Sequence, residues 1–272
     1  MDPAHLVTAH SLSAAVGWPH RPEDWAFSLD LGHGFVALDG EDVIGTILWW
    51  PFGDDHATLG MIIVAGAWQG RGCGRRLMEA AFAEIGPRQV LLNATKEGLP
   101  LYAKMGFEDV GVIGQHQGVP NGLAANEPLD GASIRALQPE DLERAMDLDA
   151  EATGWRREGL LRRLAAVGGG LVLERDGRLA GYALSRRFGR GHVIGPVVAS
   201  DDGVARALIG AWIASHGDGF VRIDTPVSSG LAEWLTSHGL LKVDDAVTMS
   251  RGASANQRPS PHLFALASQA LG

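Results

Sequence analysis

A glycine-rich run between two apolar segments constrains the fold of this chain most. The run at 69–74 reads Q-G-R-G-C-G; it follows the apolar residues 59–64 and opens a segment, 73–85, whose apolar side chains recur at helical spacing. This order predicts a strand, a tight turn and a helix N-terminus. Glycines let backbone N–H groups approach an anion closely, and the helix dipole favours negative charge there. We therefore expect an anion-binding turn at this point.

The spacing and charge of the turn narrow the kind of anion site. The pattern Q-x-x-G-x-G differs from the G-x-G-x-x-G of dinucleotide-binding folds and from the G-x-x-x-x-G-K-[ST] of P-loops. Arg71, Arg75 and Arg76 add fixed positive charge to it. These residues suit a phosphate group, but the turn alone does not identify its ligand.

Length and composition indicate a globular protein. The 272 residues suffice for one large or two ordinary domains, and 46% apolar and 20% charged residues are typical of soluble proteins. No apolar run reaches the roughly 18–20 residues of a membrane span, and no secretory signal is evident. The single cysteine, Cys73, excludes an internal disulfide and a cysteine zinc cluster. We expect a cytoplasmic protein with no metal and no membrane partner.

The acidic charge is confined to one half of the chain. Residues 1–130 carry 16 acidic and 7 basic side chains, a net charge of −9, whereas residues 131–272 carry 16 of each. Such a surface argues against a nucleic-acid partner. It suits a cationic or amine substrate, although ordinary solubility charge explains it equally well.

A weak internal repeat divides the chain in two. Asp39-Gly40 and Asp176-Gly177 each join two β-rich runs, as in a hairpin. In both halves a strand, a helix, another strand and a short helix ending at glycine follow, at 59–64, 73–85, 89–95 and 99–105, and at 192–199, 202–215, 220–225 and 229–238. We predict one domain at 1–120, a polar linker at 121–131 and a second domain at 132–272.

The two halves differ at the turn and at their start. Asp201 and Asp202 replace the glycine run, and carboxylates there repel an anion and cap a helix instead. We expect no phosphate ligand at this second turn. The second half opens with a strand near 133–137, whereas the first opens with a helix near 3–16, so a matching first strand is missing. Either the sequence starts late or this domain lacks that edge strand.

The ordered motifs of the first half resemble the GNAT superfamily of N-acetyltransferases. The resemblance covers about 5–118 and rests on the Q-x-x-G-x-G turn, a strand ending in Asn93, and L-Y-x-K-x-G-F at 101–107. Residues 132–272 look like a second, degenerate GNAT-type domain. The resemblance implies an α/β (α+β) fold with two tandem domains, each a mixed, mostly antiparallel sheet flanked by helices. Two central strands should splay apart and admit the pantetheine arm of acetyl-CoA.

The resemblance also implies which residues bind the cofactor. Backbone groups of the strand should bind pantetheine, the turn should bind the pyrophosphate, and Arg71, Arg75 or Lys104 should reach the 3′-phosphate. Asn93 should hydrogen-bond the pantetheine arm. The complete expected set is Ile62, Ile63, Val64, Gln69, Gly70, Arg71, Gly72, Cys73, Gly74, Arg75, Asn93, Leu101 and Lys104.

Tyr102 matches the family position that acts as general acid to the CoA sulfur. A packed tyrosine with a satisfied hydroxyl is the alternative. The matching residue of the second half is Leu235, which cannot donate a proton. A backbone N–H at 61–64 should bind the oxyanion. The base stays open: His56 is the best single candidate, and nearby carboxylates or an ordered water are alternatives.

Trp25 and His116 are the candidate acceptor contacts, and Trp18 could line the same pocket; core packing of the tryptophans and an interface histidine are the alternatives. A covalent acetyl group on Cys73 is not expected, because the family transfers directly. The sequence thus predicts an acetyl-CoA-dependent N-acetyltransferase that acts on a small-molecule or peptide primary amine by direct attack in a ternary complex. The protein should be a monomer or homodimer. A non-catalytic acyl-CoA-binding sensor or interaction module, and a longer acyl donor, are the competing hypotheses.

Overall fold

The computed structural model describes residues 1–121, 129–252 and 260–272, so most of the predicted linker at 121–131 lies outside the described residues. The α-helices are α1 (Leu6–Ala15), α2 (Pro22–Leu31), α3 (Cys73–Ile85), α4 (Leu99–Lys104), α5 (Leu142–Thr153), α6 (Glu158–Val167), α7 (Asp202–His216) and α8 (Ala232–Ser237). The strands are β1 (His33–Asp39), β2 (Asp42–Phe52), β3 (His56–Val64), β4 (Gln89–Ala94), β5 (Glu108–Gly118), β6 (Ala132–Ala136), β7 (Gly169–Arg175), β8 (Arg178–Phe188), β9 (Gly191–Ala199), β10 (Val221–Pro226), β11 (Leu241–Arg251) and β12 (His262–Ala265).

The internal repeat is present in the order of the elements. The series from α1 to β5 recurs from α5 to β11, with β6 added before it and β12 after it. Within the described residues of the first half no strand corresponds to β6, as the sequence indicated. The D-G turn of the second half has its expected backbone, because Asp176 and Gly177 both have positive φ, at 51° and 72°.

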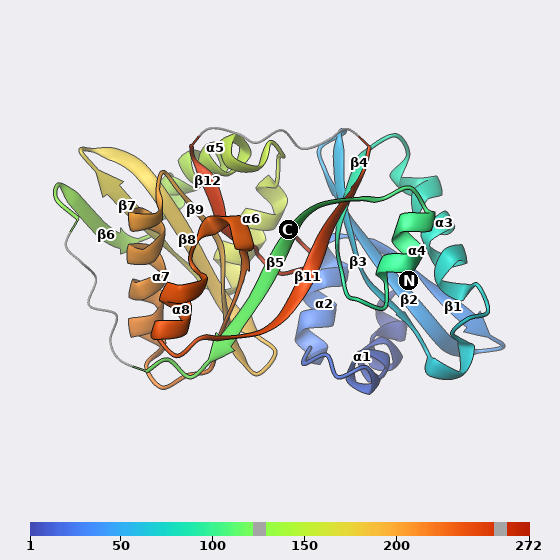
Figure 1. Ribbon diagram of the computed structural model, residues 1–272. Coiled ribbons are helices and arrows are strands. Elements are labelled where there is room, and N and C mark those ends of the chain that lie inside the picture. Colours follow the sequence, from blue (N-terminus) through green and yellow to red (C-terminus); the bar gives the residue numbers. More distant parts are fainter. Residues whose placement is uncertain (122–128, 253–259) are drawn as a thin grey trace.

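The two halves share one sheet. Its strand order is β1-β2-β3-β4-β11-β5-β10-β9-β8-β7-β6, with β12 on β9. The fold class is the predicted one, a mixed sheet flanked by helices, in which only β3–β4 and β9–β10 pair in parallel. The repeat did not predict the exchange at the centre, where β11 lies between β4 and β5 and β5 lies between β11 and β10 (Figure 1). Each half therefore completes its sheet with one strand of the other, β11 for the first half and β5 for the second.

Three apolar cores hold the fold together. One lies under α3 and contains its buried face, Leu77, Met78, Ala81 and Ile85, and another lies under α7. The third is shared, because side chains of α1, α2 and β2 pack in one cluster with those of α5, α6 and β8. Burial of apolar surface stabilises a structure by about 25 cal/mol per Å². The shared core therefore fixes the two halves against each other.

Candidate active site

A β-bulge opens the sheet between β3 and β4. The two strands pair only at residues 56–58 with 89–91. Further along, the register with β2 shifts so that Met61 and Ile62 together face one residue of β2. Met61 takes a positive φ of 54°, and its carbonyl accepts a 2.8 Å hydrogen bond from the buried hydroxyl of Thr46. Past the bulge, residues 61–64 have no β4 partner, which leaves a cleft between the strands.

The glycine turn lies beside this cleft. Gly70 and Gly72 have φ values of 74° and 80°, which L-residues with side chains rarely adopt. Gly72 precedes the first residue of α3 and supplies no side-chain cap. The N–H groups of the first helical turn have no intrahelical acceptor, so they remain available to an anion. The helix begins at Cys73, as predicted, and Cys73 itself is buried.

Cationic side chains surround the turn without covering it. Arg71 is exposed and stacks on Trp68 at 4.9 Å, and Arg75 pairs with Glu79 at 2.8 Å. Lys104 is exposed at the end of α4. Gly74 allows α3 and α4 to approach, since a Cβ there would lie 3.3 Å from Leu101. Gln69 anchors the turn through a 3.1 Å bond from its side-chain amide to the Val64 carbonyl.

Tyr102 lines the cleft from α4. Its side chain is 8% exposed, and burial raises the pKa of its hydroxyl to about 12. The ring packs on the backbone of Gly98, where a Cβ would come within 2.5 Å of it. Within the described residues the Tyr102 hydroxyl has no hydrogen-bond partner, in contrast to the alternative of a satisfied packing tyrosine. It is a protonated donor beside the cleft.

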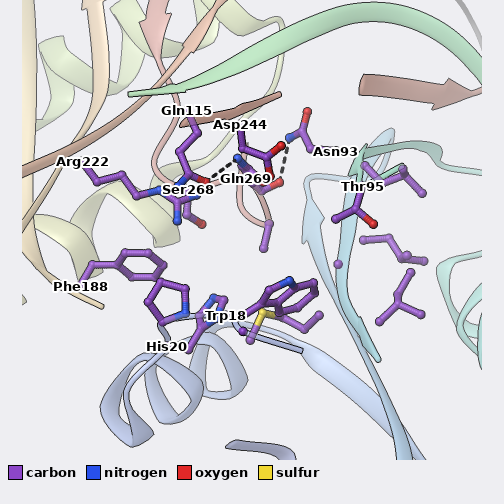
Figure 2. Close-up of a pocket in the computed structure, with 18 of the residues that line it drawn as sticks. Trp18, His20, Asn93, Thr95, Gln115, Phe188, Arg222, Asp244, Ser268 and Gln269 are labelled. Carbon is purple, nitrogen blue, oxygen red and sulfur yellow. Dashed lines mark hydrogen bonds between the residues drawn. The ribbon is translucent and has the colours of Figure 1, made fainter. Parts of the chain in front are cut away.

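A cavity of about 210 Å³ continues the cleft into the junction of the two halves (Figure 2). Its lining consists of Gly17–His20, Leu59–Ile62, Leu92, Asn93, Thr95, Tyr102, Gln115, Phe188, Arg190, Arg222, Asp244 and Ser268–Ala270. Both halves contribute, so the strand exchange builds this site.

The two residues expected to contact the acceptor lie away from the cavity. Trp25 is fully buried and donates its indole N–H to Ser13, so it is a core residue and the expected acceptor contact is wrong; Trp18 lines the cavity instead. His116 is 1% exposed in the centre of the sheet, where its Nδ1 pairs with the Leu240 carbonyl, and it does not line the cavity.

His56 also lies outside the cavity lining. It begins β3 and stacks on Trp155 with ring centroids 5.5 Å apart. Along the strand it is about 20 Å from Ile62, at roughly 3.3 Å per residue. Because a general base must come within hydrogen-bond reach of the proton it removes, His56 is not positioned for that role.

Asn93 lines the cavity, but its side chain already has partners. Its Nδ2 donates to the Gln269 carbonyl at 2.8 Å, and its Oδ1 accepts from Thr248 at 2.7 Å. In the structure Asn93 thus bonds to the C-terminal segment 266–272, and its expected bond to pantetheine stays a prediction. That segment packs where the cleft closes, since a Cβ on Gly60 would lie 3.1 Å from Ala270.

Sequence reasoning missed much of the acceptor side. His20, Arg222, Asp244 and Gln269 line the cavity and come from distant parts of the chain. Burial first, and then nearby Arg222, lower the pKa of His20 to about 4, so its imidazole is neutral. Hydrophobic periodicity and local motifs do not predict that these residues line one cavity, because their proximity depends on the strand exchange.

Among the described residues of the second half, no equivalent cleft lies between β9 and β10. Its strands β9 and β10 pair only at residues 192–193 with 221–222, but β12 pairs with β9 beyond that point. On the β10 side, Thr225 donates to the Phe264 carbonyl and the Leu266 N–H donates to the Asp224 carbonyl. The chain's own β12 thus fills the opening.

The turn before α7 is capped, as predicted. The Asp201 side chain accepts from the Val204 N–H at 2.9 Å. Burial raises the pKa of this carboxyl, but hydrogen bonds from Val204, Ser200 and Arg175 outweigh burial and leave the pKa below its usual value. Leu235 is fully buried. Neither an open anion turn nor a proton donor exists at these positions.

Comparison with known proteins agrees with this geometry. Models of the acetyltransferase (GNAT) domain match residues 30–109 and 145–265. The chain is 30% identical over 275 residues to the uncharacterized N-acetyltransferase YitH of Bacillus subtilis, covering 98% of this chain and 95% of that protein. It is 24% identical to holothin acyltransferase of Pseudoalteromonas, and the match covers 90% of this chain and 83% of that protein. The crystal structure of a putative acetyltransferase from Pyrococcus horikoshii has the same fold, with a TM-score of 0.77 and 21% sequence identity. The match covers 100% of this chain and 94% of that one.

The chain therefore belongs to the GNAT acetyltransferase family and is an acyltransferase with two GNAT domains in tandem. Acetyltransferases of this family use acetyl-CoA as cosubstrate and act on amines of small molecules or peptides. In the described ranges, no helix is long and apolar enough to cross a bilayer. The same ranges contain no group of three His, Cys, Asp or Glu side chains arranged to hold a metal ion.

Proposed function

We propose that the first half, residues 1–120, transfers an acetyl group from acetyl-CoA to a primary amine by direct attack in a ternary complex. The second half, residues 132–272, supplies one wall of the acceptor cavity and no second active site. The observation that carries this proposal is the Tyr102 hydroxyl, which has no hydrogen-bond partner among the described residues and lines the cavity between the β3–β4 cleft and the junction of the halves.

The proposed cofactor site combines the turn and the cleft. N–H groups of Gly70–Arg75 would hold the pyrophosphate, since the uncapped start of α3 favours an anion. Arg71, Arg75 and Lys104 are candidates for the 3′-phosphate because all three are exposed around the turn. Backbone groups of Ile62, Ile63 and Val64 would bind the pantetheine amides, because β4 leaves them unpaired.

Acetyl-CoA, when bound, supplies a thioester carbonyl carbon for attack by the amine. A C–N bond then forms and the C–S bond breaks. A backbone N–H at the bulge would stabilise the negative charge on the carbonyl oxygen. Tyr102 would give its proton to the departing sulfur, and its high pKa keeps that proton in place until it is needed. Asp244 and His20 line the same cavity and can accept a proton from the amine.

Release of CoA tests this proposal. Purified protein is mixed with acetyl-CoA and a broad panel of amines, and free thiol is measured against a no-amine control. Amine-dependent release supports acetyl transfer. Acetyl-CoA binding without release across the panel would instead support the sensor hypothesis, and parallel assays with longer acyl-CoA donors test the remaining alternative.

A further inference from the structure

The acceptor side of the cavity contains a buried arginine with an open edge. Arg222 on β10 is 9% exposed. Its Nε lies 3.1 and 3.0 Å from the two carboxylate oxygens of Asp224, and its Nη2 lies 2.9 Å from Oδ2. A guanidinium has five N–H donors, and this pairing uses only those on one edge.

The second edge of Arg222 has no protein acceptor. Among the described residues, Nη1 makes no hydrogen bond or ion pair. Nη1 also keeps accessible surface, and Arg222 lines the cavity. Arginine presents its donors as a rigid, planar fork that matches the two oxygens of a carboxylate. An open edge inside a cavity is thus a built recognition element for such a group.

The neighbours of Arg222 hold it in place. Asp224 is fully buried, and Gln269 donates to it at 3.3 Å. The guanidinium lies 5.4 Å from the ring centre of Phe188, and the adjacent His20 imidazole is neutral. Because Arg222 and Asp224 are buried, a charge-assisted hydrogen bond there is stronger than one at the surface.

The position of Arg222 matches the acceptor end of the cavity. Figure 2 shows Arg222, Phe188 and His20 on one side of the cavity and Asn93 and Thr95 on the other. Asn93 and Thr95 lie at the end of β4, which borders the cleft. An acceptor bound at Arg222 by one group therefore extends its other end toward the bulge. Asp244 adds a carboxylate to the lining, which suits an ammonium group.

We propose that the amine acceptor carries a carboxylate, as an amino acid does, and that Arg222 binds this carboxylate. The inference rests on the proposed acetyl transfer and adds to it the class of acceptor. Cavity size favours small acceptors, since about 210 Å³ must accommodate the acceptor beside the acetyl end of the cofactor.

Paired acceptors test this proposal. Each amino acid is compared with its decarboxylated amine: phenylalanine with phenethylamine, leucine with isoamylamine, histidine with histamine and lysine with cadaverine. We expect kcat/KM to favour the carboxylate member of the best pair by at least 100-fold, because the analogue leaves the open N–H donors of Arg222 without an acceptor in the cavity. Equal values for both members of every accepted pair would overturn the proposal.

Variants test whether Arg222 causes the preference for the amino acid over its decarboxylated amine. Removing one partner alone leaves a buried charge and can prevent folding. We therefore use Arg222→Gln combined with Asp224→Asn, and separately Arg222→Lys. Both should lose most of the preference through a higher KM for the amino acid, with the KM for acetyl-CoA unchanged. Arg178→Gln removes an exposed arginine at the start of β8 and is the control for loss of an arginine outside the cavity. Retention of the preference in both Arg222 variants would contradict the assignment.

A binding measurement separates this proposal from the proposed function. The same pairs are titrated into the CoA-bound wild type and into the double variant by calorimetry. If no amine releases CoA, acetyl transfer is wrong, but carboxylate recognition is still tested. Tighter binding of the amino acids to the wild type alone supports it. Equal binding of both members of each pair, or no binding of any amino acid, contradicts it.

Discussion

Asn93 donates a 2.8 Å hydrogen bond from its side chain to the main-chain carbonyl of Gln269, 176 positions further along the chain. This bond joins the strand that borders the cofactor cleft to the C-terminal segment that borders the acceptor cavity. The last residues of the second half are therefore part of the first half's site. The cavity of the proposed site thus has a lining from both halves.

Replacing Asn93 with alanine separates its two possible roles. We expect the KM for the amine to rise about 10-fold and the KM for acetyl-CoA to change less than twofold, because the C-terminal segment loses its anchor. The free energy of unfolding should fall by about 1–2 kcal/mol. Thr248→Val is the control, since it removes the other bond of Asn93 and leaves the bond to Gln269. A higher KM for acetyl-CoA alone would indicate that Asn93 binds pantetheine after all.

Tyr102→Phe tests the general acid. We expect kcat to fall about 100-fold, within the range for loss of an acid catalyst, with an unchanged Kd for acetyl-CoA. Steady-state kinetics and calorimetry measure the two quantities. Tyr182 is the matched control, as it is the other of the two tyrosines and donates its hydroxyl to buried Asp149. Tyr182→Phe should lower stability without this loss of kcat. Unchanged turnover in Tyr102→Phe would remove Tyr102 from the mechanism.

Gly72→Asp tests the anion-binding turn. The variant places a carboxylate at the start of α3 on a backbone with φ of 80°, and we expect acetyl-CoA binding to weaken more than 100-fold. Gly40→Asp is the control for backbone strain, because Gly40 also has a positive φ, 59°, and open space around it, but lies in the β1–β2 turn. Similar acetyl-CoA affinities in the two variants would show that the turn does not hold the pyrophosphate.

The pH dependence of stability tests the burial of His20. Burial and then Arg222 lower the pKa of His20 from 6.5 to about 4 in the folded state. Between these values the unfolded chain binds a proton that the folded chain does not, so stability is complete above pH 6.5 and is lost as the pH falls toward 4.

Urea unfolding measures this dependence at several pH values. The contribution of His20 to the slope should reach at most about 1.4 kcal/mol per pH unit, and His20→Gln should reduce the slope relative to wild type. His216, whose pKa burial also lowers to about 4, keeps its own contribution in both proteins. Identical slopes in wild type and variant would mean that His20 is not buried as described.

The elements that local sequence encodes were predicted well. Helix 73–85 follows from its amphipathic spacing, and Asp201 caps α7 because a short carboxylate before a helix satisfies a free N–H group. The positive φ of Asp176 and Gly177 follows from the demands of a tight hairpin. In each case the residues that decide the structure are neighbours in the chain.

The remainder depends on contacts between distant residues. The strand β11 pairs with β4 and β5, both of the first half, and no local motif in β11 marks these strands as its partners. The packing of Trp25 depends on a core shared with α5 and α6, and Asn93 bonds to a segment with no motif of its own. Arg222 was not predicted because a lone arginine in a strand carries no signal until its cavity is known.

The stoichiometry of acetyl-CoA binding tests the central claim most directly. Calorimetric titration of the wild-type chain should give one site per chain. In the part of the chain that the structure describes, an open turn and an open cleft occur together in the first half, whereas Asp201 and β12 occupy the equivalent positions of the second. Two equivalent sites per chain, or no binding at all, would contradict this account.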